Sequence, residues 1–240
     1  MLRIDEEKNA FRKNVKSLLK TLSLEEKENQ SKKIFSLLTS KDFYKKANLI
    51  FSYFSLDSEV NTLTLFKKTF LDGKKILLPK VCHPPLCQTK NEVCQSVSAF
   101  NEQPLNEKKS SQMEFYFIDN SKEDFPQTQM EKGAFGILEP KKNLKVFDMT
   151  SSFFCENDLS FVKNILVLVP GLAFSKDKKR LGHGKGFYDI YLSRLSSFCK
   201  ENKISLTCAG LSFDIQLFEK IPFEKNDFTL DHILSPSFFI

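Results

Sequence analysis

Hydrophobic residues in the first forty positions recur at helical spacing. At about 100° per residue, five of them fall on one narrow stripe; they are Ile4, Phe11, Val15, Leu18 and Leu22. The stripe predicts a helix over residues 4–21 that packs on a core. Ser23 and Glu26 have the spacing of a capping box and predict the start of a second helix. That helix carries Ile34, Phe35 and Leu38 toward the core.

Farther along, short apolar runs alternate with helical periodicity. The runs predict strands over residues 48–54, 75–78, 113–118, 164–169 and 204–211. Helical spacing predicts helices over residues 61–71, 187–200 and 214–219. Because some runs are apolar at every position, their strands are expected to be buried on both faces. The alternation predicts an α/β fold, a three-layer α/β/α sandwich with a mostly parallel central sheet.

Two stretches interrupt this alternation. Residues 83–112 are rich in Pro, Ser, Asn, Gln, Glu and Lys and show little periodicity, which predicts a long loop. Residues 141–160 form a second, shorter candidate insertion. A chain of 240 residues has room for one large domain or two small ones. We expect one α/β domain over residues 1–240 with these two insertions.

Composition narrows the class of protein. With 41% hydrophobic and 28% charged residues, the chain has the makeup of a soluble globular protein. The apolar run at 165–169 is far shorter than the roughly 20 residues of a membrane span. The acidic residues Asp5, Glu6 and Glu7 argue against an N-terminal targeting signal. We therefore expect a cytoplasmic protein without a membrane partner.

The six cysteines include no CxxC pair, which favours reduced thiols. Cys82, His83, Cys87 and Cys94 lie close in sequence, but their spacing matches no common zinc site. The net charge of +6 is spread along the chain and indicates an anionic ligand without implying nucleic acid. Arginine is rare in this lysine-rich chain, so positions that use its planar fork are informative; the arginines are Arg3, Arg12, Arg180 and Arg194.

The strongest chemical pattern lies between the most apolar strand and the next helix. Gly182, Gly184 and Gly186 precede that helix. Alternating glycines bring backbone N–H groups to a helix amino end, where the dipole and the unpaired donors favour an anion. Arg180 and Lys185 add positive charge. The GxGxG spacing is neither the dinucleotide pattern GxGxxG nor a Walker motif. It predicts phosphate binding, the alternative being a purely structural loop.

Three charged residues extend this hypothesis. Asp189 falls in the first turn of the predicted helix, where an acid either complements the dipole or holds Mg²⁺ on a nucleotide phosphate. Lys8 and Arg12 are four residues apart on the first helix and border its apolar stripe. Like charges at this spacing repel unless an anion lies between them. The alternative for the pair is snorkelling at the boundary of the core.

The run PGLAF…KRLGHGKGFYD resembles the signature of the 5-formyltetrahydrofolate cyclo-ligase family, also called 5,10-methenyltetrahydrofolate synthetases. Other pieces match in the same order, so the resemblance covers the chain outside 83–112 and 141–160. These pieces are Lys8 and Arg12, Ser31, Phe54 with Glu59-Val60 and Thr62, Leu78-Pro79, Phe135-Gly136-Ile137 with Glu139-Pro140, and Asn226-Asp227 with Asp231.

The resemblance implies ATP-driven, Mg²⁺-dependent ring closure of 5-formyltetrahydrofolate to 5,10-methenyltetrahydrofolate, with release of ADP and phosphate. The family's ATP site would map to Lys8, Arg12, Arg180, Leu181, Gly182, His183, Gly184, Lys185, Gly186, Phe187 and Tyr188, with Arg180 and Lys185 as catalytic residues. Its folate contacts would map to Phe54, Glu59, His183, Gly184, Lys185, Gly186 and Phe187. Its Mg²⁺ carboxylates would map to Asp189 and Asp227.

The chain departs from the family at two of these positions. His183 and Phe187 stand where animal members have Arg and Tyr, so a cation and a hydroxyl beside the folate are replaced. Two other functions remain open. One is another phosphate- or CoA-ligand enzyme on a similar sandwich, because one fold hosts many chemistries. The other is a basic nucleic-acid-binding protein, which the lack of an RNA-binding aromatic motif disfavours. The oligomeric state is open, and a monomer is compatible with the sequence.

Overall fold

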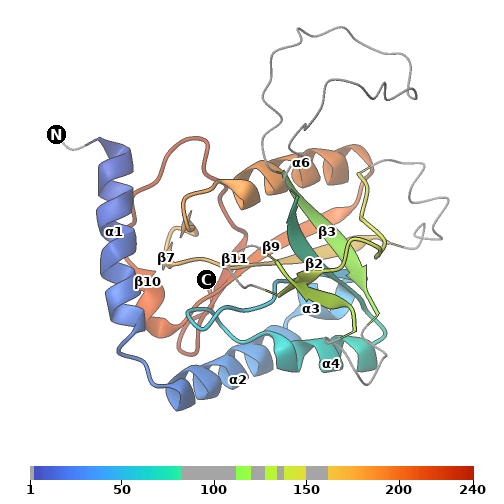
Figure 1. The fold of residues 1–240 in the computed structure, drawn as a ribbon, viewed down its shortest axis with the longest axis horizontal. Helices are drawn as coiled ribbons and strands as arrows, with labels where there is room; N and C mark the ends of the chain where they lie inside the picture. The colour runs from blue at the N-terminus through green and yellow to red at the C-terminus, as the bar shows by residue number, and fades with distance from the viewer. Residues whose placement is uncertain (1–2, 83–111, 120–127, 134–137, 150–161) are drawn as a thin grey trace, which may run out of the picture.

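A six-stranded sheet in the order β11-β9-β6-β1-β2-β3 forms the centre of the protein (Figure 1). The computed structural model describes residues 3–82, 112–119, 128–133, 138–149 and 162–240. The strands of the sheet are β1 (Leu49–Phe51), β2 (Lys75–Cys82), β3 (Gln112–Ile118), β6 (Asn164–Val169), β9 (Ser205–Leu211) and β11 (His232–Leu234). Neighbouring strands run parallel except β3, which is antiparallel to β2.

Helices cover both faces of this sheet. α2 (Leu24–Ser40), α3 (Asp42–Lys46) and α4 (Leu63–Leu71) lie on one face, and α6 (Phe187–Glu201) lies on the other (Figure 1). The predicted three-layer sandwich is therefore confirmed. α1 (Ile4–Leu19) stands at the edge of the molecule beside β7 and β10 (Figure 1). Within the described ranges, no helix is both long enough and apolar enough to cross a membrane.

The central strand β1 shows why its sequence forms a strand buried on both faces. Leu49, Ile50 and Phe51 are all 0% exposed. Leu49 and Phe51 belong to the apolar cluster under α6, whereas Ile50 belongs to the cluster under α1, α2 and α3. Successive side chains of a strand point to opposite faces, so three consecutive apolar residues fill both layers of the core.

The predicted start of α2 is confirmed in atomic detail. The Ser23 Oγ accepts the Glu26 N–H at 3.2 Å, and the Glu26 carboxylate accepts the Ser23 N–H at 2.7 Å. This reciprocal pair satisfies two backbone donors and fixes the turn between α1 and α2. The stripe predicted on α1 is confirmed in part: Val15 is fully buried and Phe11 and Leu22 pack partly on the core, but the buried leucine is Leu19 and not the predicted Leu18.

The helix predicted over 214–219 is wrong. Only one 3₁₀ turn forms (Asp214–Gln216), and the chain then continues as the short strand β10 (Leu217–Phe218). β10 pairs with β7 (Ala173–Ser175), which also pairs with β8 (Arg180–Leu181). The buried Gln216 side chain donates to the carbonyl oxygens of Gly171 and Leu172 at 2.9 and 3.1 Å. These long-range bonds override the local helical spacing.

Residues around β5, including the described part of the predicted insertion 141–160, belong to the folded structure. β4 (Met130–Lys132) and β5 (Leu138–Pro140) form a two-stranded sheet that the sequence did not predict. Within the predicted insertion 141–160, Val146 bridges Tyr116, and Phe147 packs edge-on against Phe51 with ring centroids 5.0 Å apart. Residues 141–149, the described part of this predicted insertion, thus contribute to the core. Residues 83–111 and 150–160 of the two predicted insertions lie outside the described residues.

Candidate functional site

The glycine segment lies beyond the carboxyl ends of the parallel strands, which is where ligands bind in open α/β sheets. β6 ends at Val169, the β7–β8 hairpin follows, and the segment from Gly182 to Gly186 leads into α6. Gly184 and Gly186 have φ of +99° and +68°, a backbone region that residues other than glycine rarely adopt. The N-cap residue of α6 is Gly186, which has no side chain to accept the first N–H groups of the helix, and such an amino end favours an anion.

Arg180 lies on β8 against this segment. It is 5% exposed, and its Nη2 donates to Asp189 Oδ1 at 2.7 Å. A Cβ at Gly182 would come within 2.6 Å of Arg180 Nη1, so glycine is required for the guanidinium to lie here. The Nε of Arg180 is buried and has no hydrogen-bond partner in the part of the chain that the structure describes. The arginine therefore combines one ion pair with unused donor capacity.

The predicted basic pair of α1 contacts two neighbouring parts of the candidate site. Arg12 Nε donates to the Gly182 carbonyl oxygen at 2.9 Å, and the guanidinium lies so close to Gly184 that a Cβ there would be 3.2 Å from Arg12 Cζ. Lys8 Nζ lies 2.6 Å from Asp227 Oδ2. Arg12 is thus brought beside the glycine segment, 170 residues away along the chain, whereas Lys8 reaches the loop that carries Asp227.

Lys8 is a buried cation with two carboxylate partners. Its side chain is 7% exposed, and Nζ also lies 2.6 Å from Glu224 Oε2. Burial lowers the pKa of Lys8, but hydrogen bonds and charge from Asp227 and Glu224 outweigh burial and raise it above 10.5. The ammonium is therefore charged at neutral pH, and it is paired rather than snorkelling to solvent.

The two predicted metal carboxylates come from neighbouring segments. Asp189 Oδ1 accepts the N–H of Phe228 at 3.1 Å, and Phe228 directly follows Asp227. Among the described residues there is no group of three or more His, Cys, Asp or Glu side chains arranged to hold a metal. Mg²⁺ needs only one or two protein carboxylates when phosphate and water complete its shell. The carboxylates present fit a metal that arrives with a phosphate.

The segment after β1 contributes a buried acid. Glu59 is 7% exposed at its side chain, and it accepts the Leu56 N–H at 3.0 Å. Its other carboxylate oxygen lies 3.5 Å from His183 Nε2, which connects the predicted folate residue to the glycine segment. Burial, and then the charge of Glu59, raise the pKa of Tyr53 well above 10. The Glu59 side chain is thus held in place before any ligand binds.

Other predicted site residues are placed less directly. Phe54 packs with the apolar cluster that includes Leu78 and Leu138, on the α4 side of the sheet. Leu181 is 2% exposed in the core, which leaves only its backbone for a ligand. His183 and Lys185 are exposed, and Phe187 and Tyr188 pack partly against the cluster under α6. The Tyr188 hydroxyl is buried with no hydrogen-bond partner in the described structure. Phe135 lies outside the described residues.

Sequence reasoning missed Glu224 and the packing role of Gly171. A Cβ at Gly171 would lie 2.7 Å from the Phe174 ring and 3.0 Å from Arg180 Cγ, so this glycine makes room for the arginine. Glu224 lies three residues before Asp227 in a polar loop, which was the one available signal. Its contact with Lys8 spans 216 residues and follows no local spacing.

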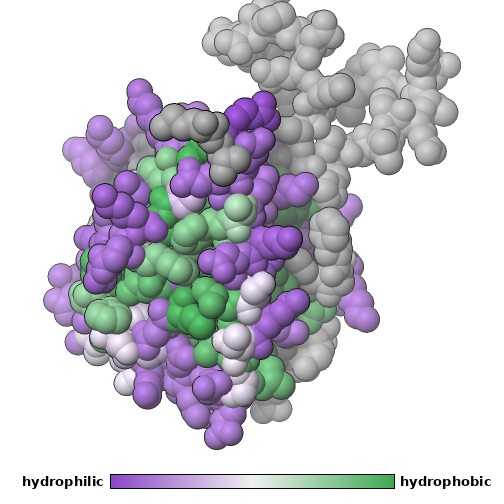
Figure 2. Space-filling view, turned by 90° about the vertical axis from the view of Figure 1, so that its left-hand side faces the viewer, coloured by the Kyte–Doolittle hydropathy of each residue, from purple (hydrophilic) through white to green (hydrophobic). Residues whose placement is uncertain are grey.

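The surface around α1 has a mixed character. Figure 2 looks onto this side of the molecule and shows hydrophobic residues gathered in the middle of the face, with hydrophilic residues around them. Ligand sites commonly combine an apolar floor with a few polar groups that fix orientation.

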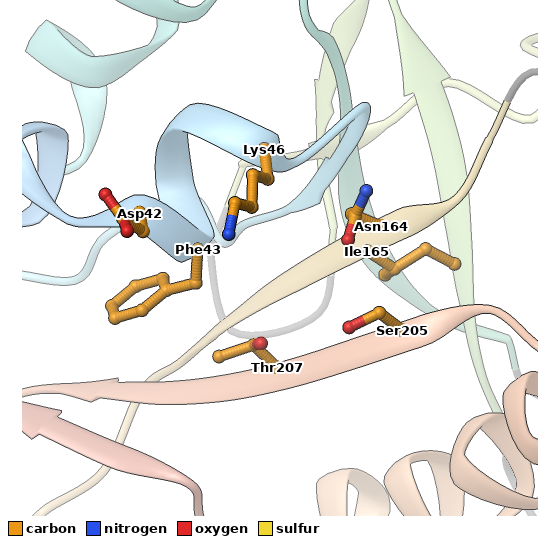
Figure 3. A pocket seen from close by; sticks show the side chains of 7 residues that line it. All are labelled: Asp42, Phe43, Lys46, Asn164, Ile165, Ser205 and Thr207. Atoms are coloured by element: carbon orange, nitrogen blue, oxygen red, sulfur yellow. The ribbon is translucent and has the colours of Figure 1, made fainter.

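A separate cavity of about 310 Å³ lies at the amino ends of the parallel strands, opposite to the glycine segment. It is bounded by α3 and by the first residues of β6 and β9 (Figure 3). Its lining includes Asp42, Lys46, Asn164, Ser205 and Thr207. None of the predicted site residues lines it. The cavity and the glycine segment are therefore distinct places in the fold.

Residues 4–236 match the sequence profile of the 5-formyltetrahydrofolate cyclo-ligase family. The chain belongs to this family of ligases. The mouse 5-formyltetrahydrofolate cyclo-ligase is 25% identical over 96% of this chain and 94% of its own length. The Haemophilus influenzae 5-formyltetrahydrofolate cyclo-ligase is 30% identical over 79% of this chain and 76% of its own length. The resemblance carried by the glycine segment is thus confirmed.

Solved structures agree with the family assignment. The chain is similar to Aquifex aeolicus 5,10-methenyltetrahydrofolate synthetase with a TM-score of 0.64 and 25% identity, over 97% of this chain and 91% of that one. A Mycoplasma pneumoniae 5,10-methenyltetrahydrofolate synthetase has the same fold, with a TM-score of 0.57 and 21% identity over 96% and 99% of the two chains. These cyclo-ligase relatives favour neither a CoA-ligand enzyme nor a nucleic-acid-binding protein.

Proposed function

We propose that the protein closes 5-formyltetrahydrofolate to 5,10-methenyltetrahydrofolate at the expense of ATP, releasing ADP and phosphate. The observation that supports this most strongly is the family membership of the chain together with the convergence of Arg12 and Arg180 on the glycine segment, with Lys8 paired to the nearby Asp227. Substrate partners are then ATP and a reduced folate. A cytoplasmic location is also proposed, supported by the unbridged cysteines at 82, 199 and 208 among the described residues.

The chemistry matches this set of residues. A formamide oxygen is a poor nucleophile and a worse leaving group. Transfer of the ATP γ-phosphoryl group to that oxygen breaks the bond to ADP and activates the formyl carbon. N10 then attacks this carbon, the C–O bond breaks so that the oxygen departs as inorganic phosphate, and the N10 proton is released to the phosphate or to water as the five-membered ring closes. Phosphoryl transfer of this kind depends mainly on positioning and on cations around the phosphate.

Each part of the site has an assigned task in the proposal. Arg12, Arg180 and Lys185 would neutralise the transferring phosphoryl group, together with the N–H groups at the start of α6. Glu59 would accept hydrogen bonds from the pterin N–H groups, and Phe187 would offer an aromatic wall. The chemistry that Mg²⁺ supplies when bound is neutralisation of phosphate charge. Asp189 and Asp227 are the carboxylates that would hold it.

The test is the growth of methenyltetrahydrofolate absorbance from 5-formyltetrahydrofolate with the full chain. We expect product only when ATP and Mg²⁺ are both present. A second measurement addresses the alternative of another phosphate- or CoA-ligand enzyme. ATP hydrolysis that does not depend on 5-formyltetrahydrofolate would contradict the proposed function.

A further inference from the structure

Lys8 has two carboxylate partners, of which only Asp227 belongs to the expected metal site. The Nζ atom lies 2.6 Å from both Asp227 Oδ2 and Glu224 Oε2. An ammonium group has three N–H donors, and these two contacts use two of them among the residues that the structure describes. Glu224 is 44% exposed at its side chain, whereas Lys8 is 7% exposed. A buried cation is thus anchored by an acid at the surface.

The two acids are held by one turn. The N–H of Asp227 donates to the carbonyl oxygen of Glu224 at 3.0 Å, and the N–H of Glu224 donates to the Asp227 carboxylate at 2.7 Å. Because these bonds fix the turn, both carboxylates are presented to the same ammonium. The backbone of the turn is fixed by these bonds, and the Glu224 carboxylate reaches Lys8 through its own, partly exposed side chain.

In the empty protein, each expected metal carboxylate is occupied by a cation of the phosphate site. Asp227 pairs with Lys8, and Asp189 pairs with Arg180. If the proposed function holds, binding of nucleotide and metal requires an exchange in which phosphate takes the cations and the metal takes the acids. A buried ammonium that loses a counter-ion is destabilised unless another is in place. Glu224 is that second counter-ion.

We propose that Glu224 is a positioning residue that holds the Lys8 ammonium toward the phosphates while Asp227 changes partner, and so couples metal binding to nucleotide binding. This inference rests on the proposed function. It concerns the nucleotide and metal in the ground state and requires no chemical step. Glu224 does not itself touch the reacting atoms.

The variant Glu224→Gln is expected to change nucleotide binding differently in the presence and in the absence of Mg²⁺. Without the Glu224 charge, Asp227 is the one carboxylate left on Lys8, so the metal competes with a stronger ion pair. We expect the Kd of a non-hydrolysable ATP analogue with Mg²⁺ to rise about five- to tenfold, at the low end of coupling between sites. With EDTA in place of Mg²⁺, the Kd should stay the same or fall, because less negative charge faces the phosphates.

Isothermal titration calorimetry on the full chain measures both constants. Glu219→Gln is the matched control, because Glu219 is exposed in the same part of the chain and pairs with Lys176 instead. This control should leave both constants unchanged. Glu224→Asp keeps the charge and should restore part of the Mg²⁺-dependent affinity. Thermal melts of the empty variants show whether each one is folded.

The outcomes distinguish this inference from the proposed function. Wild-type protein that binds the analogue, with a Glu224→Gln variant that changes both constants in parallel or neither, would overturn the role of Glu224 alone. Wild-type protein that binds no adenine nucleotide would overturn the proposed function and this inference with it. A higher Kd with Mg²⁺ together with an unchanged or lower Kd with EDTA supports the positioning role.

Discussion

The two sides of the candidate site are built by different forces. In the part proposed to bind phosphate, here called the phosphate side, cations of α1 and β8 meet acids from α6 and the loop before β11, and the contacts are ion pairs such as Lys8–Asp227 and Arg180–Asp189. In the part proposed to bind folate, here called the folate side, one buried acid, Glu59, is fixed by a backbone N–H and lies near His183. Lys8 and Arg180 on the phosphate side are therefore neutralised by protein acids without ligand, whereas the acid of the folate side is preformed.

This difference predicts how each side responds to substitution. A self-neutralised cluster must exchange partners when a ligand binds, so substitutions there should change nucleotide and metal binding together. A preformed acid changes no partner in the protein, and its loss should affect only the ligand that it contacts. The two responses are measured separately as constants for ATP, for Mg²⁺ and for 5-formyltetrahydrofolate.

The largest effect is expected for Arg180→Lys on the phosphate side. Lysine keeps the charge but replaces a rigid planar fork by a point charge on a flexible stem, so it cannot present donors to Asp189 and to phosphate in the same fixed geometry. We expect the affinity for ATP to fall by about 1.5–3 kcal/mol, the usual worth of a hydrogen bond to a charged group. Titration of an ATP analogue measures this. Arg194→Lys on the exposed face of α6 is the matched control. Equal affinity in both variants would remove Arg180 from the nucleotide site.

Glu59→Gln tests the folate side. The amide still accepts one hydrogen bond but carries no charge for the pterin N–H groups. We expect the KM for 5-formyltetrahydrofolate to rise about tenfold while the KM for ATP stays within about twofold. Asp57→Asn changes an exposed acid of the same loop and should leave both values alone. A rise in the KM for ATP alone would place Glu59 on the phosphate side and break the comparison.

Asp189→Asn distinguishes a metal carboxylate from a helix cap. Asp189 forms an ion pair with Arg180, so we expect the variant to be less stable than wild type in the absence of ligand. The expected loss in unfolding free energy is only about 1 kcal/mol, because Asp189 is partly exposed and asparagine retains a hydrogen bond. If Asp189 also holds Mg²⁺, half-maximal turnover should move to a higher Mg²⁺ concentration at saturating ATP. Thermal melts and Mg²⁺ titrations give the two readings. A lowered melting point with a wild-type Mg²⁺ curve would leave Asp189 as a structural acid.

The smallest effect is expected for the unfolding free energy at alkaline pH, where Lys8 loses its charge and its ion pairs. Because its folded pKa is raised above 10.5, the stability that it contributes is fully present below the unfolded value and is lost as pH rises through the folded pKa. The difference in unfolding free energy between wild type and Lys8→Met should therefore be constant near pH 8 and shrink above about pH 10.5. Urea unfolding over this range measures it. A difference that grows with pH would contradict the ion-paired state of Lys8.

Much of the fold was predictable because local patterns agree with the tertiary structure. The capping box at Ser23 and the fully apolar run of β6 are signals of this kind. The helix predicted at 214–219 failed because the side chain of Gln216 bonds to distant carbonyl groups. Strands as short as β8 offer too few residues for any periodicity, so their pairing is decided by neighbours far along the chain.

The candidate site also has one part that was predictable from the sequence and one part that was not. The glycines, Arg180 and Asp189 lie within ten residues of each other and were found as one motif. Lys8 and Arg12 were found through their spacing on a helix, but their partners were not. Glu224 became visible only when the fold brought it to Lys8. Charges that pair across the whole chain leave no local signature, and this is the part of the phosphate side that needed the structure.

The most direct test of the proposed activity is the ratio of ADP formed to 5,10-methenyltetrahydrofolate formed, measured in one reaction with 5-formyltetrahydrofolate, ATP and Mg²⁺. Phosphoryl activation of the formyl oxygen predicts one ADP for each methenyl product, and neither product when any of the three components is omitted. ADP release that continues without 5-formyltetrahydrofolate, or methenyl product that forms without ADP, would contradict the account.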